Sequence, residues 1–92
     1  MARLIAVDGT ETEVSPENGK SFDYKELQRH VGGYAEAKKS ADGWVLWDEE
    51  AHFKKLEHNP KGSSEARRRG AISMLTVIFG PVLICSDEEM GD

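Results

Sequence analysis

The chain contains little cysteine, proline or aromatic material and has no long apolar run. Its 92 residues include one cysteine, three prolines and 8% aromatic residues. Cys85 alone cannot form an internal disulfide, which agrees with a reducing compartment. The longest apolar run, 77–85, is broken by Gly80 and Pro81 and is far shorter than the ~20 residues that cross a bilayer. Asp8 interrupts the stretch that a secretory signal would continue, so we expect a cytoplasmic protein without a membrane segment.

Length and composition predict one small domain. Apolar residues make up 38% of the chain and charged residues 32%. A chain of this size buries roughly 60–65% of its unfolded surface, which leaves little material for a deep catalytic cleft. We therefore expect no enzyme, a single domain over residues 1–86, and an acidic tail over 87–92 that is solvated or disordered.

The net charge of −5 is unevenly distributed. Residues 8–23 contain five acids and one base, whereas residues 52–69 contain six lysines and arginines and two acids. The overall acidity argues against general duplex binding, although a local phosphate site is compatible with it. As a minor alternative, the carboxylates of Glu11, Glu13 and Glu17 could imitate nucleic-acid phosphates.

The first half of the chain predicts a hairpin followed by a helix. Residues 4–7 and 10–14 favour strands, and a turn dipeptide at Asp8 lies between them. Asp23 and Glu26 form a capping box for a helix over 24–31. The glycine that follows, Gly32, suits the left-handed C-terminal cap.

The second half predicts a further hairpin, a short helix and a buried strand. Residues 33–37 and 44–47 favour strands, and Asp42-Gly43 favours a turn between them. Residues 48–56 fit either a short helix or a turn that leads into another strand. After a turn at 59–62, Ser63 or Ser64 is expected to cap a short helix.

The last apolar segment, 75–86, is typical of a strand buried on both faces, with a bulge or an edge position at Gly80-Pro81. Together these signals predict an α+β domain. Its sheet should be antiparallel or mixed, with about 4–5 strands and two or three short helices.

The sequence contains no recognised metal or cofactor pattern. His30, His52, His58 and Cys85 stand far apart, and Cys85 ends a segment in which cysteine acts as a small hydrophobe. An enzymatic reading would need a pocket that gathers a histidine with a carboxylate. We expect no metal, no cofactor and no catalytic residue, and we expect Gly32-Gly33 to end a helix instead of holding a phosphate.

The candidate contact residues lie in the basic segment. Guanidinium groups match phosphates and acidic protein surfaces, although a solvated helix face is the alternative. Trp44 and Trp47 are three apart in a predicted strand, so they should point to opposite faces, one in the core and one exposed. The predicted partner-binding residues are Arg67, Arg68, Arg69, Lys54, Lys55 and Trp47.

The order of several short motifs resembles a phage- and mobile-element-borne domain of unknown function. These motifs are Val-Gly-Gly-Tyr-Ala-Glu at 31–36, the strand 44–47, an acidic turn at 48–50, Asn-Pro at 59–60 and the apolar end at 79–84. The resemblance covers about residues 24–86. Asp48 and Ala51 depart from the asparagine and glycine usual in the family, and the arginine run 67–69 is unusual. No catalytic residues are established for the family.

The resemblance implies a viral or plasmid context, in which small acidic intracellular proteins often bind and block a host protein. We therefore predict a non-enzymatic phage accessory protein of the host cytoplasm. It would bind and inhibit a host macromolecule, for example a bacterial defence component such as a CRISPR effector. The alternative is a binding module for a nucleotide or single-stranded nucleic acid, with Tyr34 or Trp47 as a stacking surface. A homodimer is a further expectation, because pairing would bury a strand-rich edge.

Overall fold

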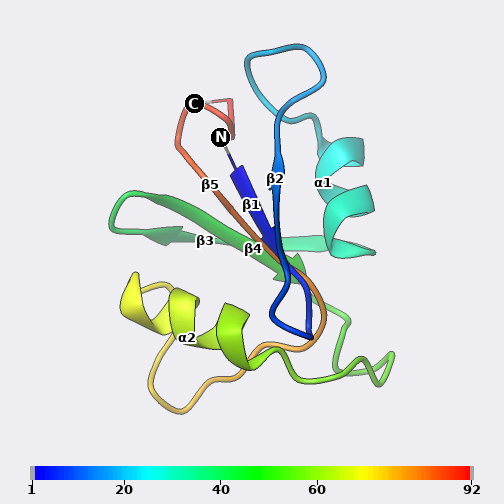
Figure 1. The fold of residues 1–92 in the computed structure, drawn as a ribbon, viewed down its shortest axis with the longest axis vertical. Coiled ribbons are helices and arrows are strands. Elements are labelled where there is room, and N and C mark those ends of the chain that lie inside the picture. The colour runs from blue at the N-terminus through cyan, green and yellow to red at the C-terminus, as the bar shows by residue number, and fades with distance from the viewer. Residues whose placement is uncertain (1, 92) are drawn as a thin grey trace.

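Residues 2–91, which the computed structural model describes, form one sheet with two helices. In chain order the elements are β1 (Ala2–Ile5), β2 (Glu11–Val14), α1 (Tyr24–Val31), β3 (Ala35–Ser40), β4 (Gly43–Asp48), α2 (Pro60–Arg68) and β5 (Val82–Cys85). The strand order is β2-β1-β5-β4-β3, and every pairing is antiparallel (Figure 1). The predicted α+β fold is confirmed. Neither helix has the length and apolarity needed to cross a membrane.

Both predicted hairpins are present. β1 and β2 are joined through Gly9, whose N–H donates to the carbonyl of Ala6 at 2.9 Å. β3 and β4 are joined at Gly43, which has a φ of 154°. A Cβ at this position would lie 2.2 Å from the carbonyl oxygen of Cys85, so glycine allows the hairpin to approach β5.

The central strand β5 is shorter than the sequence predicts. All four of its residues are buried, as expected for a strand covered on both faces. However, the predicted strand over 75–86 is wrong before Val82. Gly80 has a φ of 79°, and Pro81 has no N–H to donate to a neighbouring strand. The strand β5 therefore begins only after these two residues, at Val82.

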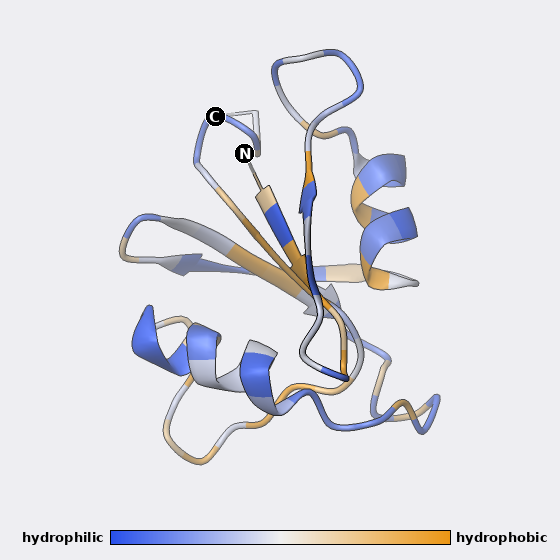
Figure 2. Cartoon of the chain, in the orientation of Figure 1, coloured by the Kyte–Doolittle hydropathy of each residue, from blue (hydrophilic) through white to orange (hydrophobic). Residues whose placement is uncertain are grey.

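The two faces of the sheet carry separate cores. Leu83 of β5 packs with Leu27 of α1, whereas the preceding Val82 packs with Ala66 of α2. Alternation along the strands therefore places one helix on each face. Figure 2 shows hydrophobic residues along the central strands and also along the loop after α2, outside the sheet.

The helix α1 begins and ends where local signals place it. The side chain of Asp23 accepts from the N–H of Glu26 at 2.9 Å, and Glu26 accepts from the N–H of Asp23 at 3.1 Å. Gly32 adopts the left-handed conformation with a φ of 91°, and its N–H donates to the carbonyl of Gln28 at 2.7 Å. The predicted helix over 24–31 and its caps are confirmed.

The N-cap of α2 is not a serine. Ser63 lies inside the helix, where its hydroxyl accepts from the N–H of Ile78 at 2.8 Å, and Ser64 is exposed. The cap is Asn59, and Pro60 follows at the first helical position, where the missing N–H costs nothing. The prediction of a serine cap was wrong because the helix begins earlier than a turn over 59–62 implies.

The side chain of Asn59 is fully buried and joins three segments. Its Oδ1 accepts from the N–H of Gly62 at 2.8 Å, which completes the cap. Its Nδ2 donates to the carbonyl of Ile5 at the end of β1 and to the carbonyl of Gly80 ahead of β5, each at 2.9 Å. One amide therefore fixes α2 against two neighbouring strands.

The structure describes the expected solvated or disordered tail over 87–92 as far as residue 91, with Asp87 and Glu88 exposed. Residues 86–91 form a turn in which Glu89 is buried, and residue 92 lies outside the described part. Glu89 accepts from the N–H of Ser86 at 2.9 Å through its side chain, and from the N–H of Phe22 at 2.7 Å through its carbonyl. These bonds attach the turn to the segment that precedes α1.

The three bonds of Asn59 make a prediction about stability. Asn59→Ala removes the cap and the donor to the carbonyls of Ile5 and Gly80, so we expect the free energy of unfolding to fall by about 3 kcal/mol. Asn59→Asp restores only the cap oxygen and should be similarly unstable. Urea denaturation measures both, with the exposed Ser64→Ala as the control on the same helix. A loss below about 1 kcal/mol for Asn59→Ala would contradict this role.

Candidate functional site

The three predicted contact arginines lie at the end of α2, and two of them hold neighbouring loops. Arg67 donates from Nη2 to the carbonyl of Thr76 at 3.0 Å. Arg69 pairs through Nη1 with Asp42 Oδ1 at 2.6 Å. Arg68 pairs with Glu65, but its side chain is 67% exposed. Arg68 is therefore the member of this run that is most accessible to a partner.

Of the two predicted contact lysines, Lys54 is bound within the chain and Lys55 is exposed. Nζ of Lys54 lies 2.7 Å from Asp48 Oδ2 and 3.2 Å from the carbonyl oxygen of Gly32, at the end of α1. The hydrogen bond with Asp48 raises the pKa of Lys54. The Asp48 side chain is fully buried, and its Oδ1 accepts from the N–H of Glu50 at 2.9 Å. Lys55 is exposed and has a φ of 58°.

These contacts settle the open question about residues 48–56. Asp48 ends β4, and the residues that follow form hydrogen-bonded turns instead of a helix or a further strand. Asp48 does cap the local backbone, as its position predicts, but it caps a turn. Lys54 then fastens the turn to the carboxyl end of α1, where a cation complements the helix dipole.

Trp44 and Trp47 lie on opposite faces of the sheet, as their spacing predicts. Trp44 packs against the core under α1, and Lys39 Nζ lies 5.6 Å from its ring centre. Trp47 packs against the core under α2. Both side chains are half-buried, so the expectation that one would be exposed is not met.

Four large apolar side chains that the sequence did not single out are exposed. Met74 is 85% exposed and Leu75 is 94% exposed, in the loop between α2 and β5. Phe53, in the loop between β4 and α2, is 82% exposed. Val77 completes the group, which we call the apolar surface: Phe53, Met74, Leu75 and Val77. For Met74, Leu75 and Val77 the sequence signal was the apolar run ahead of Gly80-Pro81, which the structure leaves outside the sheet.

The two loops that carry the apolar surface meet each other. His58 and Phe79 form an isolated antiparallel bridge, and the N–H of Asn59 donates to the carbonyl of Ile78 at 2.9 Å. In Figure 1 both loops lie at the side of the sheet that α2 covers. The loops that carry the apolar surface therefore lie on the α2 side of the molecule.

A cavity of about 210 Å³ lies between these loops and β4. Its aromatic walls are Trp47, His52 and Phe79, and Asp48, Glu49 and Val77 also line it. The His52 and Phe79 ring centres are 5.8 Å apart. We call it the aromatic cavity. It contains one of the predicted contact residues, Trp47, and adjoins the apolar surface through Val77.

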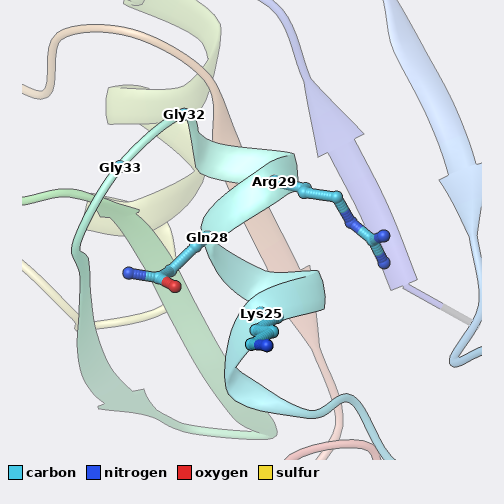
Figure 3. A pocket seen from close by; sticks show the side chains of 5 residues that line it. All are labelled: Lys25, Gln28, Arg29, Gly32 and Gly33. Atoms are coloured by element: carbon cyan, nitrogen blue, oxygen red, sulfur yellow. The ribbon is translucent and has the colours of Figure 1, made fainter.

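A wider hollow of about 590 Å³ lies beside α1. Figure 3 shows Gln28 and Arg29 pointing in different directions, so their polar groups do not converge on one point. Arg29 pairs with Glu17 at 2.5 Å. Gly32 ends the helix, as the sequence favours, and the carbonyl end of α1 faces this region. Because the carboxyl end of a helix carries partial negative charge, this hollow does not favour a phosphate.

The acidic stretch is partly neutralised within the chain. Glu11 pairs with Lys61 at 2.6 Å and with Arg3 at 2.9 Å, and the hydrogen bond from Lys61 lowers the pKa of Glu11. Glu17 is engaged by Arg29. Two of the three carboxylates that could imitate phosphates therefore have cations of their own.

Cys85 and the three histidines lie in different places in the fold. Cys85 is buried, and this burial, with the charges of Glu89 and Asp87, raises the pKa of the thiol to about 12. His30 packs edge-on against Phe22 on the α1 side, whereas His52 and His58 flank Phe79. Within residues 2–91, no group of three or more potential metal ligands is gathered.

The contact between Lys54 and Asp48 makes a prediction about local order. Lys54→Met leaves a buried carboxylate without its cation, so we expect faster amide hydrogen exchange over residues 49–56 and unchanged exchange in β5. Lys55→Met removes the same charge one residue away and should leave the exchange unchanged both over residues 49–56 and in β5. Asp48 raises the pKa of Lys54 above the ordinary value of 10.5. The stabilisation that the charged Lys54 gives to the turn is therefore complete below pH 10.5 and is lost as the pH rises through the raised pKa. Equal exchange in both variants would contradict the anchoring role.

The chain was also compared with known proteins. No family model, no curated protein and no solved structure matches it. The resemblance to a phage-borne domain of unknown function therefore stays a prediction.

Proposed function

We propose that this chain is a non-enzymatic binding protein that docks on another protein through the apolar surface. The observation that carries the proposal is the exposure of Leu75, at 94%, beside Met74, at 85%. A small domain that leaves side chains of this size in water forgoes the roughly 1.5–3 kcal/mol that burying each of them would contribute. Exposed apolar side chains that lie together, as Met74 and Leu75 do at neighbouring positions of one loop, are typical of protein interaction sites.

The conformation of the loop supports the same function. The Ser73 and Thr76 hydroxyl groups are 2.9 Å apart, and Arg67 holds the carbonyl of Thr76. These contacts close a turn that presents Met74 and Leu75 at its tip. A loop that is ordered before binding loses less conformational entropy when a partner covers it.

The resemblance to phage-borne domains supplies the biological setting of the proposal. In that setting the partner is a host macromolecule, for example a protein of a bacterial defence system such as a CRISPR effector. Blocking the partner is the expected consequence. A surface that covers part of a host protein needs no catalytic group, which fits the separate positions of Cys85 and the histidines.

A paired capture experiment tests the proposal. The double variant Met74→Ser with Leu75→Ser should fold normally, because both side chains are exposed, and should bind the partner at least ~10-fold more weakly. Tagged wild-type and variant chains are compared in a bacterial lysate, with Tyr24→Ser as the control because Tyr24 is exposed on α1. Bound proteins are identified by mass spectrometry, and their affinities are then measured with purified partner. A partner that binds wild type and double variant equally would overturn the proposal.

Binding of a nucleotide or single-stranded nucleic acid is the second candidate function, and the observation that favours it is the exposure of Tyr34, at 56%. Mononucleotides and oligonucleotides would then quench tryptophan fluorescence, with an affinity that falls steeply as salt increases. Under the proposed function the same titration gives no saturable change. Saturable, salt-dependent quenching that is lost in Tyr34→Ala would favour nucleotide or nucleic-acid binding.

A further inference from the structure

The aromatic cavity has walls that suit a cation. Trp47 comes from β4, and the rings of His52 and Phe79 lie 5.8 Å apart on the two loops. Phe79 also contacts a second histidine, His58, and their ring centres are 5.9 Å apart. The face of an aromatic ring is negative, so a lysine or arginine group within about 6 Å of it is attracted.

Two carboxylates line the same cavity. Asp48 and Glu49 line it, and Lys54 is engaged with Asp48 on one side. The remaining charges of the segment 49–57 are three acids, Glu49, Glu50 and Glu57, against Lys55. On the neighbouring strand, Glu36 is opposite Trp47 in the register and lies 3.7 Å from Lys38. Of the two carboxylates that line the cavity, Asp48 is therefore neutralised by Lys54, and Glu49 supplies the negative charge.

The volume also limits the occupant. Pockets for drug-sized molecules are typically about 300–1,000 Å³, so 210 Å³ is small for a nucleotide and suits one side chain. Because Val77 belongs both to the cavity and to the apolar surface, a side chain that enters the cavity would come from whatever covers Met74 and Leu75.

We infer that the aromatic cavity receives a lysine or arginine side chain of the partner protein while apolar neighbours of that residue cover Met74 and Leu75. This inference rests on the proposed function and adds the chemistry of the partner. The cation would lie against the rings and near the carboxylate of Glu49. A central side chain in a pocket, surrounded by contacts that exclude water, is the usual arrangement of an interface anchor.

The cavity can be tested without knowing the partner. The probe is N-acetyl-arginine amide, titrated into the ¹⁵N-labelled chain and followed by NMR, with N-acetyl-citrulline amide as the neutral analogue of the same shape. We expect saturable shifts at the indole N–H of Trp47 and the amides of His52 and Phe79, with a Kd on the order of 1–10 mM. The citrulline probe should bind several-fold more weakly. No saturable shift at these positions, or equal binding of both probes, would overturn the inference.

Matched variants separate charge from shape. Glu49→Gln keeps the volume and removes the rim charge, so the arginine probe should bind about fivefold more weakly, as expected for about 1 kcal/mol of exposed electrostatic attraction. Glu50→Gln removes the same charge from the next residue, which does not line the cavity, and should have a smaller effect. An equal effect of the two substitutions would contradict a site at the cavity.

The double variant at Met74 and Leu75 distinguishes this inference from the proposed function. It should bind the arginine probe as wild type does, because neither residue lines the cavity. Loss of the partner in this variant, together with no probe binding by wild type, would leave the proposed docking surface standing and remove the inferred basic anchor. Retention of the partner would remove the docking surface, whatever the probe shows.

Discussion

The amide group of Asn59 is the contact on which the α2 side of the molecule depends. It accepts from the N-terminus of α2 and donates to carbonyls of two segments that lead into or out of neighbouring strands. Gly62 makes room for this arrangement, because a Cβ there would lie 2.5 Å from Val82 Cγ2. A buried amide with all three bonds made stabilises the junction, whereas the same group half-paired would be costly.

The position of Asn59 also connects fold to proposed function. It lies where the loop between β4 and α2 ends, and its N–H bonds the loop between α2 and β5 through Ile78. The two loops carry Phe53, Met74 and Leu75, none of which is held by the core. Polar contacts of buried groups therefore fix the loops and leave their apolar side chains outside. This is how a chain of 92 residues can keep an ordered apolar surface without a larger core.

The parts of the fold that local chemistry determines were predictable from the sequence. The helix α1 follows from Asp23, Glu26 and Gly32, which lie within a few residues of the backbone groups they cap. The cap of α2 was missed because residues 59–62 were assigned to a turn, although the capping bond from Gly62 to Asn59 is local. The other two bonds of Asn59 could not be predicted, because Ile5 and Gly80 are 54 and 21 residues away. The strand over 75–86 was overextended for a related reason. An apolar run does not show where the neighbouring strand stops pairing.

The candidate site was harder to predict, because a charged residue can be bound to another part of the chain in the fold and is then not available to a partner. The basic run predicts an acidic partner only if its cations are free, yet Arg67 and Arg69 bind Thr76 and Asp42, and Lys54 binds Asp48. These contacts join residues 6 to 27 positions apart in the chain, so spacing alone does not reveal them. Once they form, the loop that lines the aromatic cavity retains Glu49, Glu50 and Glu57 against Lys55. The charge that a partner meets there therefore differs from the basic charge of residues 52–69, because Glu49 and Glu50 lie outside that segment and Lys54 is already paired with Asp48.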